Sequence, residues 1–206
     1  MTHAIVSFGL LLLFAAPLVA QTNFHLDEPF QRPTKIPDGL LPLLRGEIKS
    51  TCQNDAAFQS TDARSLFVAS RITLNHRKAL ILKSGHQCLT GGDNASFWVY
   101  VRTTQRYRLV LASGTISVDV LRTRSHGLRD IETNMATGAY GFRNIYKFNG
   151  SVYKARVCSE WEMHGLSRPK PHRVPCRRRP QTPPNKSLDA SGGSVFRIII
   201  GSAMLD

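Results

Sequence analysis

Serine, histidine and acidic side chains stand close together at one point of the chain. Ser125 and His126 are adjacent, and Asp130 follows in the same polar stretch. These are the residue types of a hydrolytic triad, but a triad depends on geometry, and a serine beside its own base in one turn seldom points at it. We therefore predict a solvated turn here, and keep a hydrolase of unfamiliar type using His126 and Asp130 as the alternative hypothesis.

The spacing of the residues indicates neither a metal site nor a pair of catalytic carboxylates. No two histidines lie four positions apart, and no HExxH motif occurs. Nothing in the spacing of the acidic residues singles out two of them as a glycosidase pair. The acidic candidates are Asp93, Asp119, Asp130, Glu132, Glu160 and Glu162. We predict a non-enzymatic protein with no catalytic residues, no metal site and no cofactor.

Cysteine usage indicates structural disulfides. The four cysteines are Cys52, Cys88, Cys158 and Cys176. A zinc site would need paired ligands at short spacing, which these widely separated residues lack. An even number of cysteines in an exported chain favours disulfides, and three pairings are possible.

The charge of the chain favours an anionic partner. There are 27 Lys and Arg residues against 14 Asp and Glu residues, for a net charge of +13. Such a balance permits association with nucleic acid, lipid headgroups or acidic glycans. Nucleic acid is disfavoured, because the basic, proline-flanked stretch 168–179 lacks interleaved aromatic residues for base stacking.

The N-terminus reads as a secretory signal. Residues 4–19 are almost wholly apolar, and Leu18-Val19-Ala20 ends in the small residue that signal peptidase requires. The stretch is broken by Pro17 and is short for a membrane anchor. We expect a signal peptide at 1–20, no membrane span after its removal, and a periplasmic or secreted protein.

A linker, a short helix and a tail are expected around the central region. Residues 21–37 carry three prolines and read as an extended linker. Within 38–64, Asp38 can cap an amphipathic helix ending near Lys49, and a connecting loop follows. Residues 163–206 are rich in Pro and Arg and are predicted to be largely disordered. Within them, Val195–Ile200 stays open between an edge strand and an unstructured tail.

Residues 65–162 are predicted to form an antiparallel β domain of four hairpins. Alternating apolar residues in 97–103 place apolar groups on both faces of one strand. Asn149-Gly150 is the strongest turn signal, since both residues accept the left-handed backbone of a type I′ turn. The hairpins pair 65–74 with 79–82, 97–103 with 107–112, 116–121 with 130–134, and 142–148 with 151–157. The predicted fold class is α+β, mainly β: an antiparallel sheet of hairpins with one short N-terminal helix and disordered ends.

Residues 66–161 resemble uncharacterised exported bacterial proteins with a small β-domain, loosely related to FG-GAP-type repeats. The matching stretches are Leu74–Ala79, Ser96–Arg102, His126–Ile131 and Tyr146–Tyr153. The resemblance implies a closing hairpin that ends in cysteine, and it makes Cys88 and Cys158 the candidate disulfide residues. The first turn reads Asn75-His76-Arg77-Lys78 where Asp and Gly are expected, which removes any argument for calcium.

The leading hypothesis is a binding module. Positive charge without catalytic chemistry points to an aromatic and basic sheet surface that contacts an anionic envelope component or another protein. A degenerate family member without activity is a further alternative. The candidate binding residues are Trp98, Tyr100, Arg106, Tyr107 and Arg108.

Overall fold

The computed structural model describes six stretches of the chain: 21–52, 61–84, 86–90, 95–137, 140–162 and 170–176. The predicted signal peptide at 1–20 and the stretch Val195–Ile200 lie outside the described residues. Within the described stretches, no helix is both long and apolar enough to cross a bilayer.

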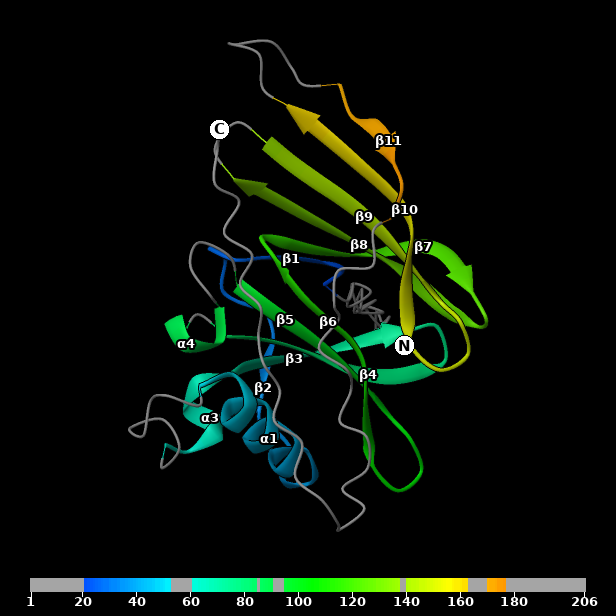
Figure 1. The fold of residues 1–206 in the computed structure, drawn as a ribbon. Coiled ribbons are helices and arrows are strands. Elements are labelled where there is room, and N and C mark those ends of the chain that lie inside the picture. The colour runs from blue at the N-terminus through cyan, green and yellow to red at the C-terminus, as the bar shows by residue number, and fades with distance from the viewer. Residues whose placement is uncertain are drawn as a thin grey trace, which may run out of the picture.

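The β domain consists of two antiparallel sheets rather than one (Figure 1). The first sheet has the order β1-β7-β8-β9-β10-β11 and the second β2-β3-β4-β5-β6. The first comprises β1 (Asn23–His25), β7 (Ser117–Ser125), β8 (Leu128–Thr137), β9 (Tyr140–Phe148), β10 (Tyr153–Glu162) and β11 (His172–Val174). The second comprises β2 (Pro33–Thr34), β3 (Val68–Leu74), β4 (Arg77–Ser84), β5 (Ala95–Arg102) and β6 (Tyr107–Thr115). The predicted fold class, α+β and mainly β, is confirmed.

Helices form a third layer against the second sheet (Figure 1). A 3-10 turn η1 (Asp38–Leu40) leads into α1 (Leu41–Thr51), and the short helices α3 (Ala63–Leu66) and α4 (Gln87–Thr90) flank it. The predicted helix is thus confirmed, although its expected cap is wrong, because the side chain of Asp38 makes no capping hydrogen bond.

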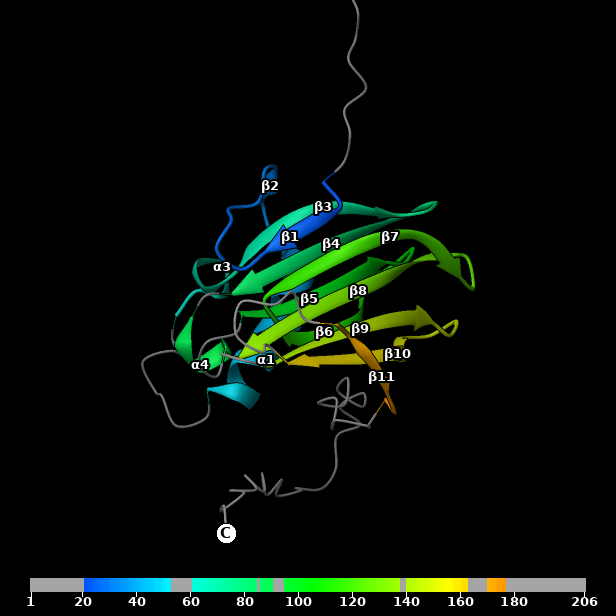
Figure 2. The ribbon, with the colours of Figure 1, turned by 90° about the horizontal axis from the view of Figure 1, so that it is seen from above.

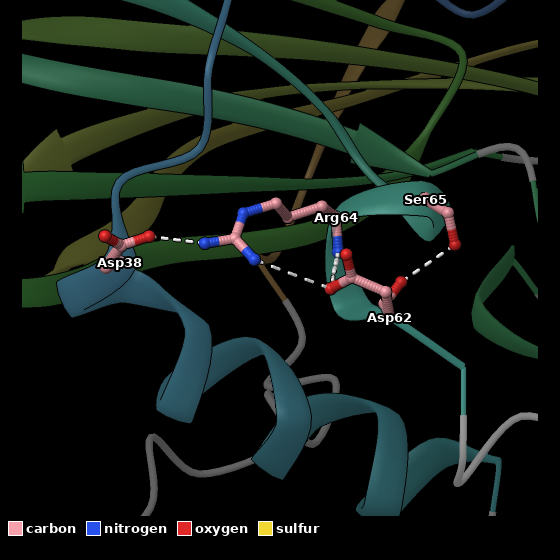
Figure 3. A network of polar contacts seen from close by, with 4 residues as sticks. All are labelled: Asp38, Asp62, Arg64 and Ser65. Atoms are coloured by element: carbon pink, nitrogen blue, oxygen red, sulfur yellow. Dashed lines mark hydrogen bonds and ion pairs between the residues drawn. The ribbon is translucent and has the colours of Figure 1, made fainter.

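Asp38 instead takes part in an ion-pair network that joins two helical elements (Figure 3). The guanidinium of Arg64 donates to the Asp38 carboxylate and lies 3.8 Å from the Asp62 carboxylate. Asp62 caps α3 by accepting from the backbone N–H of Arg64, and its carbonyl accepts from the Ser65 hydroxyl at 2.8 Å. All four residues are engaged with one another, so we regard this network as structural.

Alternation along β5 explains why the second sheet lies in the middle. Phe97, Val99 and Val101 pack into the core between the two sheets. Trp98 and Tyr100 point the other way, into the core beneath α1. Because successive side chains of a strand face opposite sides, a strand with two apolar faces must be covered on both.

Residues 21–37 are part of the fold, so their prediction as an extended linker is wrong. β1 pairs with β7, and β2 pairs with β3. Phe24, Phe30 and Ile36 are buried, which anchors the segment to both cores. Sparse apolar residues without periodicity were enough, because each fills a separate position in a core built by distant strands.

Lys83 fastens the loop between β1 and β2. Its ammonium donates to the carbonyl oxygens of His25 at 3.0 Å, Leu26 at 2.8 Å and Glu28 at 2.5 Å. It also lies 5.2 Å from the centre of the Phe30 ring. All three N–H donors of the ammonium are used within the protein, which gives this lysine a structural role.

The described part of the tail is ordered, so its predicted disorder is wrong for 170–176. β11 pairs antiparallel with β10, from Cys158 opposite Val174 to Glu160 opposite His172. A disulfide from Cys158 to Cys176 holds this edge strand in place. The two remaining parts of the predicted tail, 163–169 and 177–206, are not described.

The structure decides the cysteine pairing, which the sequence left open among three possibilities. Cys88 bonds to Cys52 and Cys158 to Cys176, so both candidates form disulfides but not with each other. The Cys52–Cys88 bridge joins the C-terminal end of α1 to α4. The predicted use of cysteine in disulfides, with Cys88 and Cys158 among the bonded residues, is therefore confirmed.

All four predicted hairpins form, but the first and third turns are shorter than predicted, at 75–76 and 126–127, and the last turn is longer. The last hairpin closes at Phe148 opposite Tyr153, leaving a four-residue loop, 149–152, instead of a two-residue type I′ turn. The Asn149 side chain closes this loop by accepting from the backbone N–H groups of Ser151 at 3.0 Å and Val152 at 2.8 Å. Asparagine was thus a correct turn signal that acts through its side-chain oxygen.

Candidate anion-binding surface

Two of the five predicted binding residues are buried. Trp98 is 3% exposed and Tyr100 1% exposed, both under α1. Trp98 packs edge-on against Phe67, with ring centroids 5.1 Å apart. Their assignment to a binding surface is wrong, because a strand buried on both faces carries aromatic residues for packing.

The other three predicted residues are accessible to different degrees. Arg106 is exposed in the loop between β5 and β6, whereas Tyr107 and Arg108 are half-buried. Tyr107 packs against the core beneath α1. Of the predicted set, Arg106 thus has the exposure that contact with a large partner requires.

The residues of the hydrolase hypothesis are engaged separately. His126 Nδ1 bonds to the carbonyl oxygen of Phe148 at 2.8 Å. Asp130 is 1% exposed and lies 3.5 Å from the ammonium of Lys147. Among the interactions of the described residues, no hydrogen bond joins His126 to Asp130 or to Ser125. His126 is held by Phe148 and Asp130 by Lys147 instead.

The turns of all four hairpins lie at one end of the molecule (Figures 1 and 2). Consecutive antiparallel strands reverse direction, so every second connection lies at the same end of the sheet. The connections at this end are 75–76, 103–106, 126–127 and 149–152. We call residues 75–78, 102–106, 122–130 and 147–154 the hairpin-tip surface.

Two hydrogen bonds lock three of these tips together. The Asn75 side chain donates to the carbonyl oxygen of Gly127 at 3.1 Å, which ties the second sheet to the first. The bond from His126 Nδ1 to Phe148 ties the next pair of tips. Because a carbonyl oxygen can only accept, this bond requires the proton on Nδ1, and the residue as a whole remains exposed.

The residues that make these bonds have an uncommon backbone. Asn75 and His126 are the non-glycine residues with positive φ in the described chain, at 65° and 46°. A non-glycine residue in this region costs energy, and such positions cluster at sites where geometry must be held. The two inter-tip bonds therefore fix the relative position of the tips at some local cost.

Positive charge collects on the hairpin-tip surface. Its exposed or half-exposed basic side chains come from every tip. They are His76, Arg77, Lys78, Arg102, Arg106, Arg122, Arg124, His126, Arg129, Lys147 and Lys154. The acidic residue within these ranges is Asp130, which is buried and paired with Lys147. The surface therefore presents cations without exposed carboxylates between them.

Apart from Asp130, the acidic residues of the described chain lie away from the hairpin-tip surface. Some belong to the helix layer or the loop after β1, and others to the far half of the first sheet. They are Asp27, Glu28, Asp38, Glu47, Asp62, Asp119, Glu132, Glu160 and Glu162. This uneven distribution of charge gives the tips a positive electrostatic potential. The net charge of the chain alone does not say where on the surface that potential lies.

Asp130 and its neighbours hold the tips from inside. The guanidinium of Arg129 donates to the carbonyl oxygens of Val120 and Leu121, where β7 bulges. The Tyr153 hydroxyl donates to the carbonyl oxygen of Arg129 at 2.6 Å. Burial, and then the Asp130 carboxylate, raise the pKa of Tyr153. We therefore assign Arg129 and Asp130 to support of the surface.

Replacing Lys147 with methionine should lower the free energy of unfolding by roughly 1–3 kcal/mol, because it leaves the buried Asp130 charge uncompensated. The ammonium is on a side chain that is 44% exposed, which places the loss at the lower end of this range. Asp130→Asn removes the buried charge itself and should cost less. Urea unfolding of both variants and of the double variant checks the order, and a larger loss for Asp130→Asn would contradict it.

Comparison with known proteins gives no relative on which to rest an assignment. Neither family models, curated proteins nor solved structures match the chain. The resemblance to exported bacterial β-domains therefore stays a prediction. Within the described residues, no group of three His, Cys, Asp or Glu side chains could hold a metal ion.

The turns carry a sequence signal for the hairpin-tip surface. Basic residues occur at the turns themselves, as in His76-Arg77-Lys78 and around His126. Each turn by itself has the sequence of a solvated loop. Only the alternation of strand direction, which places the turns of both sheets together, makes one surface of them.

Proposed function

We propose that this protein is an exported, non-enzymatic module that binds an anionic component of the envelope through the hairpin-tip surface. The observation that supports it is the collection of basic side chains from four hairpins around one buried, paired carboxylate. Disulfides support an oxidising compartment. The proposal keeps Arg106 from the residues predicted from sequence and replaces the two buried aromatics.

The tips suit contact through charge rather than insertion. The exposed large hydrophobic residues of the described chain are Leu43, Val68 and Tyr140, and none of them belongs to the hairpin-tip surface. There is thus no exposed aromatic residue there for base stacking and no apolar wedge for a bilayer core. An array of Lys and Arg attracts a polyanion in a salt-dependent way.

Reversing four tip charges should abolish this binding. The variant Arg77→Glu, Lys78→Glu, Arg122→Glu, Arg124→Glu changes exposed side chains only. At roughly 1 kcal/mol for each basic residue lost, the affinity for immobilised polyphosphate should fall about a thousandfold at moderate salt. Surface plasmon resonance at several salt concentrations measures both the affinity and its salt dependence.

A matched control separates the site from the net charge. The variant Arg32→Glu, Lys35→Glu, Arg45→Glu, Lys49→Glu makes the same change of charge at exposed positions on either side of β2 and in the helix layer. It should bind polyphosphate within about tenfold of the unmodified chain. Equal losses in the two variants, or no binding by the unmodified chain, would refute the proposed site.

A further inference from the structure

The outer face of the first sheet carries an ordered set of side chains far from the tips. Residues directly opposed in antiparallel strands share a face, so the strand register assigns them to rows. One row holds His25, Ser117, Asn134, Arg143, Ser159 and Arg173. The next holds Asn23, Asp119, Glu132, Ile145 and Val157, and a third holds Ala136, Gly141 and Trp161. We call these three rows the outer face.

The outer face is the side of the sheet that does not pack on the second sheet. Phe24 and Val118 lie between row residues, and Ile131 directly precedes Glu132; all three belong to the core between the sheets. Since side chains alternate along a strand, the rows must point away from that core. Arg143 is exposed, and Trp161 and Ser159 are half-exposed.

Trp161 lies directly on the backbone of Gly141. A Cβ atom placed on Gly141 would lie 1.9 Å from both Cε2 and Cζ2 of the indole, so the ring occupies the space above this glycine. An aromatic residue packed over a glycine stabilises a sheet, and this packing occupies one face of the indole. Trp161 is half-exposed, so part of the indole remains open to solvent.

Polar groups border the indole at the spacing of the sheet. Arg143 is one strand across and two residues along from Trp161, which corresponds to about 5 Å and 7 Å. Its guanidinium donates to Glu132 at 2.6 Å, and Asn134 bonds to Glu132 at 3.4 Å and to Ser117 at 3.3 Å. Both donors and acceptors are thus held in a plane beside an aromatic ring.

The outer face is electrically balanced, unlike the tips. Its charged residues are Asp119, Glu132, Arg143 and Arg173, two of each sign. Asp119 accepts a hydrogen bond from Asn23, and Glu132 pairs with Arg143. A ligand with net charge therefore gains little from this face, whereas a neutral ligand with many hydroxyl groups meets donors and acceptors together.

From this geometry we propose that the outer face binds a neutral carbohydrate chain, with a sugar ring stacked on Trp161. A pyranose ring presents apolar C–H groups on its faces and hydroxyls around its rim. The first match the open part of the indole, and the second match Arg143, Glu132 and Ser159. This site is independent of the proposed anion-binding function.

The test uses Trp161 as its own reporter. The chain has two tryptophans, so a Trp98→Phe variant leaves Trp161 as the sole indole. The full chain is titrated with cello-, manno- and chito-oligosaccharides while Trp161 emission is recorded. A saturable change with at least one of them is expected, and no change with any of them overturns the proposal.

Two further variants place the ligand on the face. Trp161→Ala should reduce the affinity for the active oligosaccharide at least tenfold. Because that variant also uncovers Gly141, Ser159→Arg blocks the position beside the ring while keeping it, and should reduce affinity to the same extent. Circular dichroism checks the fold, and undiminished binding by folded Ser159→Arg overturns the location.

The tip variant separates this proposal from the proposed function. The fourfold charge reversal at Arg77, Lys78, Arg122 and Arg124 should leave oligosaccharide binding unchanged, within about twofold. Polyphosphate should not alter Trp161 emission. If polyphosphate saturably quenched Trp161, the outer face would be an anion site and the carbohydrate proposal would be wrong, whatever the tips bind.

Discussion

Replacing Trp98 with alanine is expected to lower the free energy of unfolding by about 3–5 kcal/mol. The indole is 3% exposed and packs between α1 and the second sheet, in edge contact with Phe67. Truncation removes the buried area and leaves a cavity that the surrounding strands cannot close. Urea unfolding followed by circular dichroism measures the loss.

Arg106→Ala is the control for this prediction. Arg106 is exposed in the neighbouring loop and should change stability by less than about 0.5 kcal/mol. Under conditions in which it remains folded, the Trp98→Ala variant should bind polyphosphate with the same affinity as the unmodified chain. A stable variant with impaired binding would mean that Trp98 belongs to a ligand surface, which would contradict the three-layer arrangement.

Removing the Cys52–Cys88 disulfide by a double alanine substitution should cost about 4 kcal/mol. The bond closes a loop with a sequence separation of 36 residues, and a loop of this length restricts the unfolded chain by roughly that amount. It also fastens the end of α1 to α4. Thermal unfolding measures the loss, and hydrogen exchange of α1 locates it.

The Cys158–Cys176 bond provides the matched comparison. Its sequence separation is 18, so the same reasoning gives roughly 3 kcal/mol, and its loss should release β11 rather than α1. Hydrogen exchange of the two double variants should therefore rise in different elements. Faster exchange of α1 in the Cys158–Cys176 variant, or a larger loss of stability there, would contradict this account.

The two proposed sites occupy different parts of the first sheet. The tips take the ends of β7 to β10 that carry the turns, and the outer face takes the remaining half of the same strands. One site has unbalanced positive charge and no exposed aromatic residue, and the other has balanced charge and an indole. A polymer that combines sugar rings with anionic groups would contact both sites. A protein that carries the tip variant and Ser159→Arg together should then lose more affinity for such a polymer than a protein with either change alone.

Local signals in the sequence determined the strands and turns. The hairpins followed from alternating apolar residues and from turn residues such as Asn149 and Gly150, because side-chain direction and turn chemistry depend on near neighbours. The helix followed in the same way from the spacing of Leu40, Leu44 and Ile48, all of which are buried. An even number of cysteines likewise indicated disulfides.

Only the tertiary structure decided which surfaces are free. The same alternation that identified β5 could not say that Trp98 and Tyr100 would lie under a helix. The cysteine pairing, the division into two sheets and the inclusion of 21–37 also depend on which distant segments meet. These outcomes arise from burial shared among segments far apart in the chain, and no local pattern encodes that sharing.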